Sequence, residues 1–129
     1  MNNNSCFNIN FNSISIIPAE LRSTCEGMLA DSSYAIIQTV LGKLARSFPN
    51  DTRSILRKVD GVRGPHERVR IAKLEIEATA GDKGAMKELA DLASSGWEFV
   101  TRQNAMGALR RIGHLSSEAA ESLVEALFS

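Results

Sequence analysis

The closest approach to a catalytic pattern in this chain is the sequence His-Glu-Arg-Val-Arg at residues 66–70. A zinc-binding helix of the His-Glu-x-x-His type needs two imidazoles four residues apart, so that both face one metal ion. Arg70 stands in the place of the second imidazole, and its cationic guanidinium would repel zinc. We therefore interpret Pro65, His66 and Glu67 as the polar first turn of a helix, where the helix dipole favours the carboxylate of Glu67.

The other residues that could do chemistry are scattered along the chain. His114 is isolated after a predicted helix end, where it is expected to interact with carbonyl groups that have no helical partner. Cys6 and Cys25 could pair with each other, but the favoured interpretation is two free thiols, with Cys25 a small apolar core residue. No serine lies in a Gly-x-Ser-x-Gly turn, and the glycines at 81 and 84 lack the spacing of a phosphate-binding loop. The sequence therefore predicts no catalytic residue, no metal site and no cofactor in this chain.

Basic side chains gather around one predicted loop, which makes this region a candidate binding surface. They are Arg53, Arg57, Lys58, Arg63, His66, Arg68, Arg70 and Lys73, with Arg102, Arg110 and Arg111 continuing the series further along the chain. Because guanidinium groups bind carboxylates through two parallel hydrogen bonds, we predict contacts to a peptide or partner protein at Arg63, His66, Arg70 and Arg102. The alternative is a solvated face with local ion pairs, such as one between Lys73 and Glu77. The sequence Trp97-Glu98-Phe99 is interpreted as a packing anchor rather than a ligand platform.

Composition limits the classes of partner and location. Fifteen basic residues balance fifteen acidic ones, so no nucleic-acid partner is predicted. No run approaches the roughly 20 apolar residues that span a bilayer, and residues 1–5 do not begin a signal peptide. A soluble chain that does not bind a membrane is expected, in either the cytoplasm or the periplasm.

Hydrophobic periodicity divides the chain into an extended arm and a helical region. In residues 1–17, apolar Phe7, Ile9 and Phe11 alternate with asparagines, which is typical of an extended strand-like segment. From Pro18 onward the spacing is helical. Helices are expected at about 19–30, 32–48, 51–60, 65–80, 83–95 and 97–113, and from Ser116 to the chain end, with a loop at 61–65 and a left-handed cap at Gly96.

A shift of 34 residues superposes the apolar positions of successive helices. The first helix of each pair gives three columns, namely Ile37, Ile71 and Ala105, then Val40, Leu74 and Ala108, then Leu44, Ala78 and Ile112. The second helices match through Leu21, Ile55, Leu89 and Leu123, and again through Cys25, Val59, Ala93 and Leu127. Such an offset predicts stacked helix pairs. The predicted fold is an all-α α-α superhelix of the HEAT/ARM type, with about seven antiparallel helices at 18–129 after an extended arm at 1–17.

Both ends of this pattern are expected to be interrupted. The helix at 19–30 falls in a second-helix column with no first helix before it, and residues 127–129 carry no polar capping helix. Because terminal repeats usually need a polar outer face, we interpret the chain as part of a longer protein or as one that self-associates.

Several segments resemble the C-terminal helical domain of bacterial zinc aminopeptidases related to aminopeptidase N. The similar segments are residues 17–22, 33–34, 48–49, 69–76 and 98–106, and the likeness covers about 17–128. In that family the catalytic domain carries the zinc, while the C-terminal domain closes over the active site and shapes peptide access. None of the family's catalytic residues has a matching position here, so the resemblance implies zinc only in a separate catalytic domain.

Two functions from different classes follow as hypotheses. The first is a non-catalytic module of a zinc aminopeptidase, whose partner is its own catalytic domain and, through it, a peptide. The alternative is a self-standing HEAT-like scaffold that binds another protein or a second copy of itself. Nucleic-acid binding through the basic residues at 53–73 is the weakest alternative.

Overall fold

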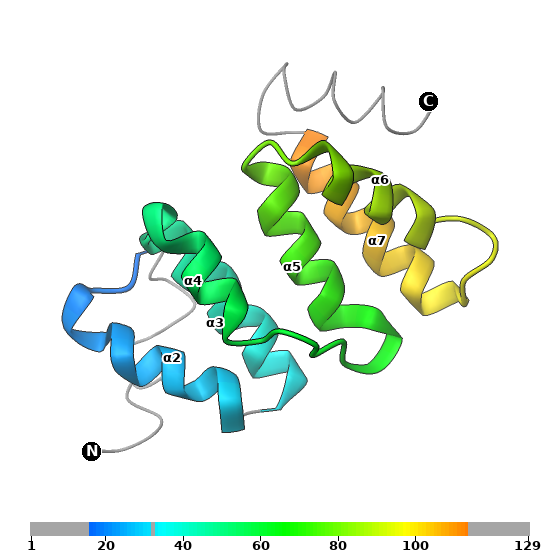
Figure 1. Cartoon of the computed structure of the whole chain (residues 1–129). Coiled ribbons are helices and arrows are strands. Elements are labelled where there is room, and N and C mark those ends of the chain that lie inside the picture. Colours follow the sequence, from blue (N-terminus) through cyan, green and yellow to red (C-terminus); the bar gives the residue numbers. More distant parts are fainter. Residues whose placement is uncertain (1–15, 32, 114–129) are drawn as a thin grey trace. The chain divides into compact units, whose positions relative to one another are not determined.

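The described part of the chain is entirely helical. The structure, a computed structural model, describes residues 16–31 and 33–113, and these form six α-helices and three short 3-10 helices with no strand (Figure 1). The predicted extended arm lies almost wholly outside these residues, as does the helix predicted after Ser116. The chain divides into two compact units, residues 1–62 and 63–129, and each is described by itself.

The helices follow one another in the predicted order. The first unit contains η2 (Ala19–Leu21), α2 (Arg22–Asp31), α3 (Tyr34–Ser47), η3 (Pro49–Asp51) and α4 (Thr52–Arg57). The second unit contains η4 (Pro65–Glu67), α5 (Arg68–Thr79), α6 (Lys83–Leu92) and α7 (Phe99–Gly113). Two of the helix starts have side-chain caps, because Ser33 accepts from the Ile36 amide and Asp82 accepts from the Ala85 amide.

The first unit packs α2 and α4 against α3. Its core includes Cys25, Val40, Leu44, Ile55 and Val59, all fully buried. Before η2, buried Ile17 donates its backbone amide to the Ser47 hydroxyl at 2.6 Å, which attaches the start of the unit to the end of α3.

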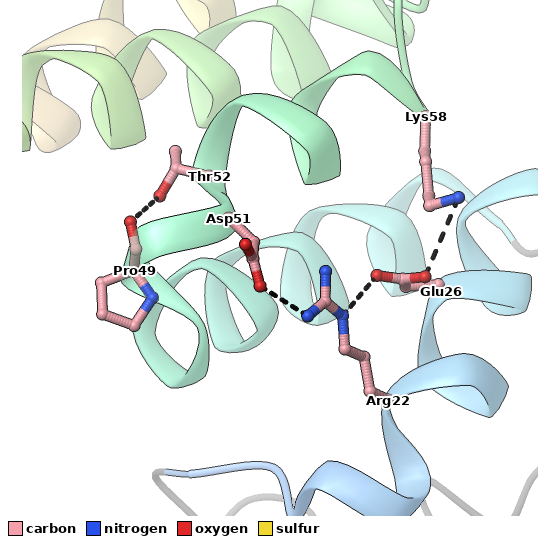
Figure 2. A network of polar contacts seen from close by, with 6 residues as sticks. All are labelled: Arg22, Glu26, Pro49, Asp51, Thr52 and Lys58. Carbon is pink, nitrogen blue, oxygen red and sulfur yellow. Dashed lines mark hydrogen bonds and ion pairs between the residues drawn. The ribbon is translucent and has the colours of Figure 1, made fainter.

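A polar network on the first unit connects α2 to both ends of the short α4 (Figure 2). Arg22 Nε donates to Glu26 Oε2 at 2.8 Å, and Arg22 Nη1 donates to Asp51 Oδ2 at 2.6 Å. Lys58 Nζ lies 3.8 Å from Glu26 Oε1, and the Arg22 guanidinium also covers the Phe48 ring at 4.7 Å. The network therefore attaches α2 to both ends of α4. Arg22 holds Asp51 just before the helix, and Glu26 holds Lys58 just after it.

In the second unit, α5, α6 and α7 each pack on the other two (Figure 1). The core combines side chains from all three helices: Ile71, Leu74, Ala78, Ala85, Met86, Leu89, Leu92, Ala105, Ala108, Leu109 and Ile112. Trp97, just before α7, packs against this cluster and is partly buried.

The repeat columns correspond to the core positions of both units. All nine residues of the three first-helix columns are buried, from Ile37 on α3 to Ile112 on α7. In the second-helix columns Ile55, Leu89, Cys25 and Val59 are buried, whereas Leu21 and Ala93 are half-buried. The remaining members, Leu123 and Leu127, lie outside the described residues.

Several helix bounds differ from the predictions. The helix predicted over 65–80 begins only at Arg68, since His66 and Glu67 adopt left-handed backbone angles with φ of 54° and 59°. Glu67 was predicted to lie in the first turn of this helix, but it precedes the helix. The first amides of α5 are satisfied instead by the Arg63 carbonyl, which accepts from Val69 at 2.8 Å and from Arg70 at 3.2 Å.

The predicted cap at Gly96 is also wrong. The helix ends at Leu92, where the amides of Ala93 and Ser94 return to the carbonyls of Leu89 and Asp91. The glycines with positive φ among the described residues are Gly61, Gly64 and Gly81 instead. In the first unit, α4 ends at Arg57 rather than near residue 60, because the next three amides bond to the third carbonyl back and tighten the chain into turns.

The expectation of free thiols is wrong for Cys25. The side chain is fully buried in the first unit, as predicted for a core residue, but it is disulfide-bonded. Cys6 lies outside the described residues. Whether two sulfur atoms come within bonding distance depends on tertiary placement, which their positions in the sequence do not determine.

Candidate protein-binding surface

Three of the four basic residues predicted to contact a partner lie in the loop before α5 or in the first turn of that helix. Arg63 and Arg70 lie on either side of Glu67, whose side chain is only 12% exposed. Arg63 Nε is 3.7 Å from Glu67 Oε2, and Arg70 Nη1 is 3.6 Å from Glu67 Oε1. Arg70 reaches α6 as well, with Nη2 at 3.4 Å from Glu88 Oε2. Both guanidinium groups therefore already have carboxylate partners within their own unit.

His66 is paired in the same way. Its Nδ1 lies 2.5 Å from Oε1 of Glu98, and the Thr101 hydroxyl donates to the same oxygen at 3.1 Å. The hydrogen bond from His66, followed by that from Thr101, lowers the pKa of the Glu98 carboxyl below its ordinary value. This contact connects the loop before α5 to the start of α7.

His66 and Glu67, which have different partners, both adopt left-handed backbone angles. His66 contacts Glu98, whereas Glu67 contacts Arg63 and Arg70. Non-glycine residues rarely adopt such angles, and two in succession redirect the chain sharply before the helix starts. Glu67 Oε2 is buried without a hydrogen bond, and its ion-pair contact among the described residues is the 3.7 Å contact with Arg63. Arg63, His66 and Arg70 form a local ion-pair cluster with acidic partners, and their contact with a partner protein stays a prediction.

Arg102, the fourth predicted contact, has a different environment on α7. Its guanidinium lies over the Phe99 ring at 6.0 Å, within the range of a cation–π contact. Neither Arg102 nor Arg110 forms an ion pair with any residue in the described ranges 16–31 and 33–113. Arg111, in contrast, is held by Glu75 through two hydrogen bonds of 2.9 and 2.7 Å.

Apolar side chains are exposed on the same helix. Phe99 is 63% exposed, Val100 44% and Met106 43%. Phe99, Gln103, Met106 and Arg110 follow a spacing of four, three and four residues, which places them in one stripe along α7. The opposite side of α7 faces the core through Thr101, Ala105, Ala108, Leu109 and Ile112. We call the outward side, comprising Phe99, Val100, Arg102, Gln103, Met106 and Arg110, the α7 surface.

The sequence predicted Arg102 as a contact residue, which stays a prediction, but it did not predict the α7 surface. The segment 97–99 was interpreted as a packing anchor, and only Trp97 packs against the core, with its Nε1 donating to Asp91 Oδ2 at 3.2 Å. Phe99 points away from that core, as its exposure shows. The repeat columns contained a signal for the exposed side of this helix. Ala105, Ala108 and Ile112 belong to the columns and are buried, whereas Phe99 and Met106 do not belong to them and are exposed.

Two further properties bear on the choice of function. In the part of the chain that the structure describes, no three His, Cys, Asp or Glu side chains gather in a group that could hold a metal ion. None of the described helices is both long and apolar enough to cross a membrane.

Comparisons with protein-family models, with curated proteins and with solved structures found no match for this chain.

Proposed function

We propose that this chain is a non-catalytic helical-repeat module whose function is to bind a protein or a peptide. The observation that carries the proposal is the α7 surface, where Phe99 and Met106 are exposed in one stripe. Arg102 and Arg110 lie beside them and, unlike Arg111, have no carboxylate partner in the described residues. Aromatic residues, methionine and arginine are the residue types enriched at protein interfaces. Such a combination favours a partner with both apolar and acidic groups.

The architecture proposed for the module is a HEAT-like superhelix. The support comes from the 34-residue offset, since the residues of all three first-helix columns are buried on α3, α5 and α7. A repeat of this kind needs neighbouring pairs to bury its apolar faces. Stacked repeats of this kind create extended concave surfaces that bind ligands.

The more specific form of the proposal names the partner as the catalytic domain of a zinc aminopeptidase. It is supported by the resemblance of residues 17–22, 69–76 and 98–106 to the C-terminal domain of that family. The module would cover the active site and shape peptide access, and zinc would be held by the catalytic domain alone. We expect the purified chain to hydrolyse no aminoacyl-nitroanilide, with or without added zinc, and metal-dependent turnover would contradict this. A native reading frame with an upstream His-Glu-x-x-His sequence would support the aminopeptidase relation.

The alternative is a self-standing scaffold that binds another protein or a second copy of itself. It is favoured by the same exposed residues, Phe99, Val100 and Met106, because homodimer interfaces are enriched in apolar area. Sedimentation equilibrium over a hundredfold range of concentration separates a monomer from a self-associating chain.

The experiment that tests protein binding is site-specific photo-crosslinking in the full chain. A benzophenone amino acid is placed at Met106 and, as the matched control, at exposed Lys87 on α6. We expect cells producing the protein to give a discrete crosslinked protein at position 106 and none at position 87. The crosslinked protein is then identified, purified and mixed with the chain. Equal crosslinking at both positions, or none at either, would contradict the proposed function.

A further inference from the structure

We propose that the α7 surface binds an acidic amphipathic helix of a partner protein. This inference rests on the proposed function and adds to it the chemical class of the partner. Three properties of the described residues lead to it, namely the shape of the stripe, its charge, and the way in which nearby charges are already paired.

The stripe has the geometry of one side of a helix–helix contact. Phe99, Gln103, Met106 and Arg110 recur at helical spacing along about three turns of α7, and the core residues occupy the opposite side. A partner helix with apolar side chains three and four residues apart would lie along this stripe. Phe99 supplies a large rigid contact at one end, and Met106 supplies a flexible one in the middle.

The charge of α7 is of one sign. Residues 99–113 contain Arg102, Arg110 and Arg111 and no acidic residue. Arg111 is neutralised by Glu75, whereas Arg102 and Arg110 have no ion pair among the described residues. The guanidinium of Arg102 lies beside the exposed Phe99 ring. A partner that carries carboxylates beside its apolar stripe would therefore complement both the apolar and the cationic parts of the surface.

Two acidic residues of the described part of the chain that lie near this surface already have partners. Glu98, immediately before α7, accepts from both His66 and Thr101 and is thus directed toward the loop before α5. Glu75 holds Arg111 on the α5 side. Within residues 16–31 and 33–113, the positive charge of the surface that has no ion pair consequently lies at Arg102 and Arg110, on the helix that carries the exposed apolar residues.

Two synthetic peptides test the inference. Each has about 20 residues, because shorter isolated helices are scarcely populated in water. One has leucines three and four residues apart with glutamate at the flanking positions, and the other has lysine in place of every glutamate. Binding to the full chain is measured by fluorescence anisotropy at low salt. We expect the glutamate peptide to bind about ten-fold more tightly or better than the lysine peptide, and the ratio to decrease as salt is added.

Substitutions on the surface distinguish the apolar from the charged contribution. The pair Phe99→Ser and Met106→Ser is expected to abolish binding of the glutamate peptide. The pair Arg102→Gln and Arg110→Gln is expected to weaken it about ten-fold and to remove its salt dependence. The matched control is Arg53→Gln with Lys87→Gln, which removes the same charge from two exposed residues on α4 and α6. The control is expected to bind as the unmodified chain does, and unchanged urea midpoints verify that every variant is folded.

Five outcomes would overturn the inference. Equal binding of the two peptides would show that acidic chemistry is not selected, and binding unaffected by Phe99→Ser with Met106→Ser would place the contact elsewhere. Self-association that this pair abolishes, without peptide binding, would make a second copy the occupant. Retention on anionic vesicles, without preference between the peptides, would make a membrane surface the ligand. If photo-crosslinking at Met106 identifies a protein but the glutamate peptide does not bind, this inference fails while the proposed function stands; if crosslinking fails too, both fail.

Discussion

Glu77 on α5 carries a carboxylate that is unfavourably placed. Burial, and then the negative charges of Asp82 and Glu88, raise its pKa above the ordinary value of 4.5, while Lys73 opposes this shift. The folded chain therefore holds the proton more tightly than the unfolded chain. The free energy of unfolding falls as the pH rises from the ordinary pKa of a glutamate to the raised pKa of Glu77. The destabilisation is therefore fully present at neutral pH and is lost at acidic pH.

We accordingly expect Glu77→Gln to increase the urea midpoint at pH 7. The increase should shrink as the pH falls toward 4, where the carboxyl of the unmodified chain becomes protonated. Urea denaturation of both chains at several pH values measures this dependence. An increase that is the same at every pH would show that ionisation of Glu77 is not its cause.

Asp82 caps α6 by accepting a hydrogen bond from the Ala85 amide at 3.1 Å. Removing such a cap usually costs about 1 kcal/mol, within a range of roughly 0.5–2. We expect Asp82→Ala to lower the free energy of unfolding by this amount. Asp82→Asn keeps the cap oxygen while losing the charge that acts on Glu77, so the difference between the two variants isolates the cap. Equal stability of Asp82→Ala and Asp82→Asn would contradict this role.

At the scale of elements, an arginine–carboxylate pair joins α7 to α5. Arg111 donates to both oxygens of Glu75, whereas the pair of Arg70 with Glu88, between α5 and α6, has a single contact at 3.4 Å. Surface ion pairs stabilise by about 0.2–1 kcal/mol, and good bidentate geometry favours the upper part of that range. The side chain of Arg111 is 61% exposed, so solvent screening keeps the contribution within this limit.

A double-mutant cycle on Arg111→Ala and Glu75→Ala is expected to give a coupling energy of about 0.5 kcal/mol at low salt. The same cycle on Arg70 and Glu88 provides the comparison and is expected to give less. Added sodium chloride should reduce both values. A larger coupling for the single-contact pair would show that geometry does not determine the strength of these contacts.

The elements were predictable to different degrees. Helix starts at Ser33 and Asp82 were recognisable because their capping oxygens act within three residues of the cap. The start of α5 was not, because the group that satisfies its first amides is the Arg63 carbonyl, brought there by left-handed angles at His66 and Glu67. Glu67 gave no signal for that conformation, which glycine and asparagine adopt more readily.

At the scale of the whole molecule, the division into two compact units falls within the loop between α4 and α5. Gly61 and Gly64 both adopt positive φ there, and the Arg63 side chain is 66% exposed. Residues 1–15 and 114–129 contain no lysine or arginine, so trypsin reports only on the described part of the chain. Cleavage requires several residues to extend into the protease, which a junction between compact units permits more easily than a packed helix.

We expect the first tryptic cut of the native chain to fall after Arg57, Lys58 or Arg63, giving two fragments of similar size. Mass spectrometry of an early time point identifies the site. The variant Arg63→Gln should move cleavage to Arg57 or Lys58 without slowing it greatly. First cuts within α5, α6 or α7 would contradict the division into units.

The sequence by itself determined the all-helical class, the order of the helices and the residues of the core. It did so because the offset of 34 residues and the three-and-four spacing are visible in the order of residue types along the chain, and burial of Ile37, Leu74 and Ile112 follows from them. Tertiary structure alone decided which charges are already paired. Arg63, His66 and Arg70 meet Glu67, Glu98 and Glu88 through contacts that depend on how the loop and three helices pack. It also decided which side of α7 is exposed, because that side is defined only once α5 and α6 cover the other.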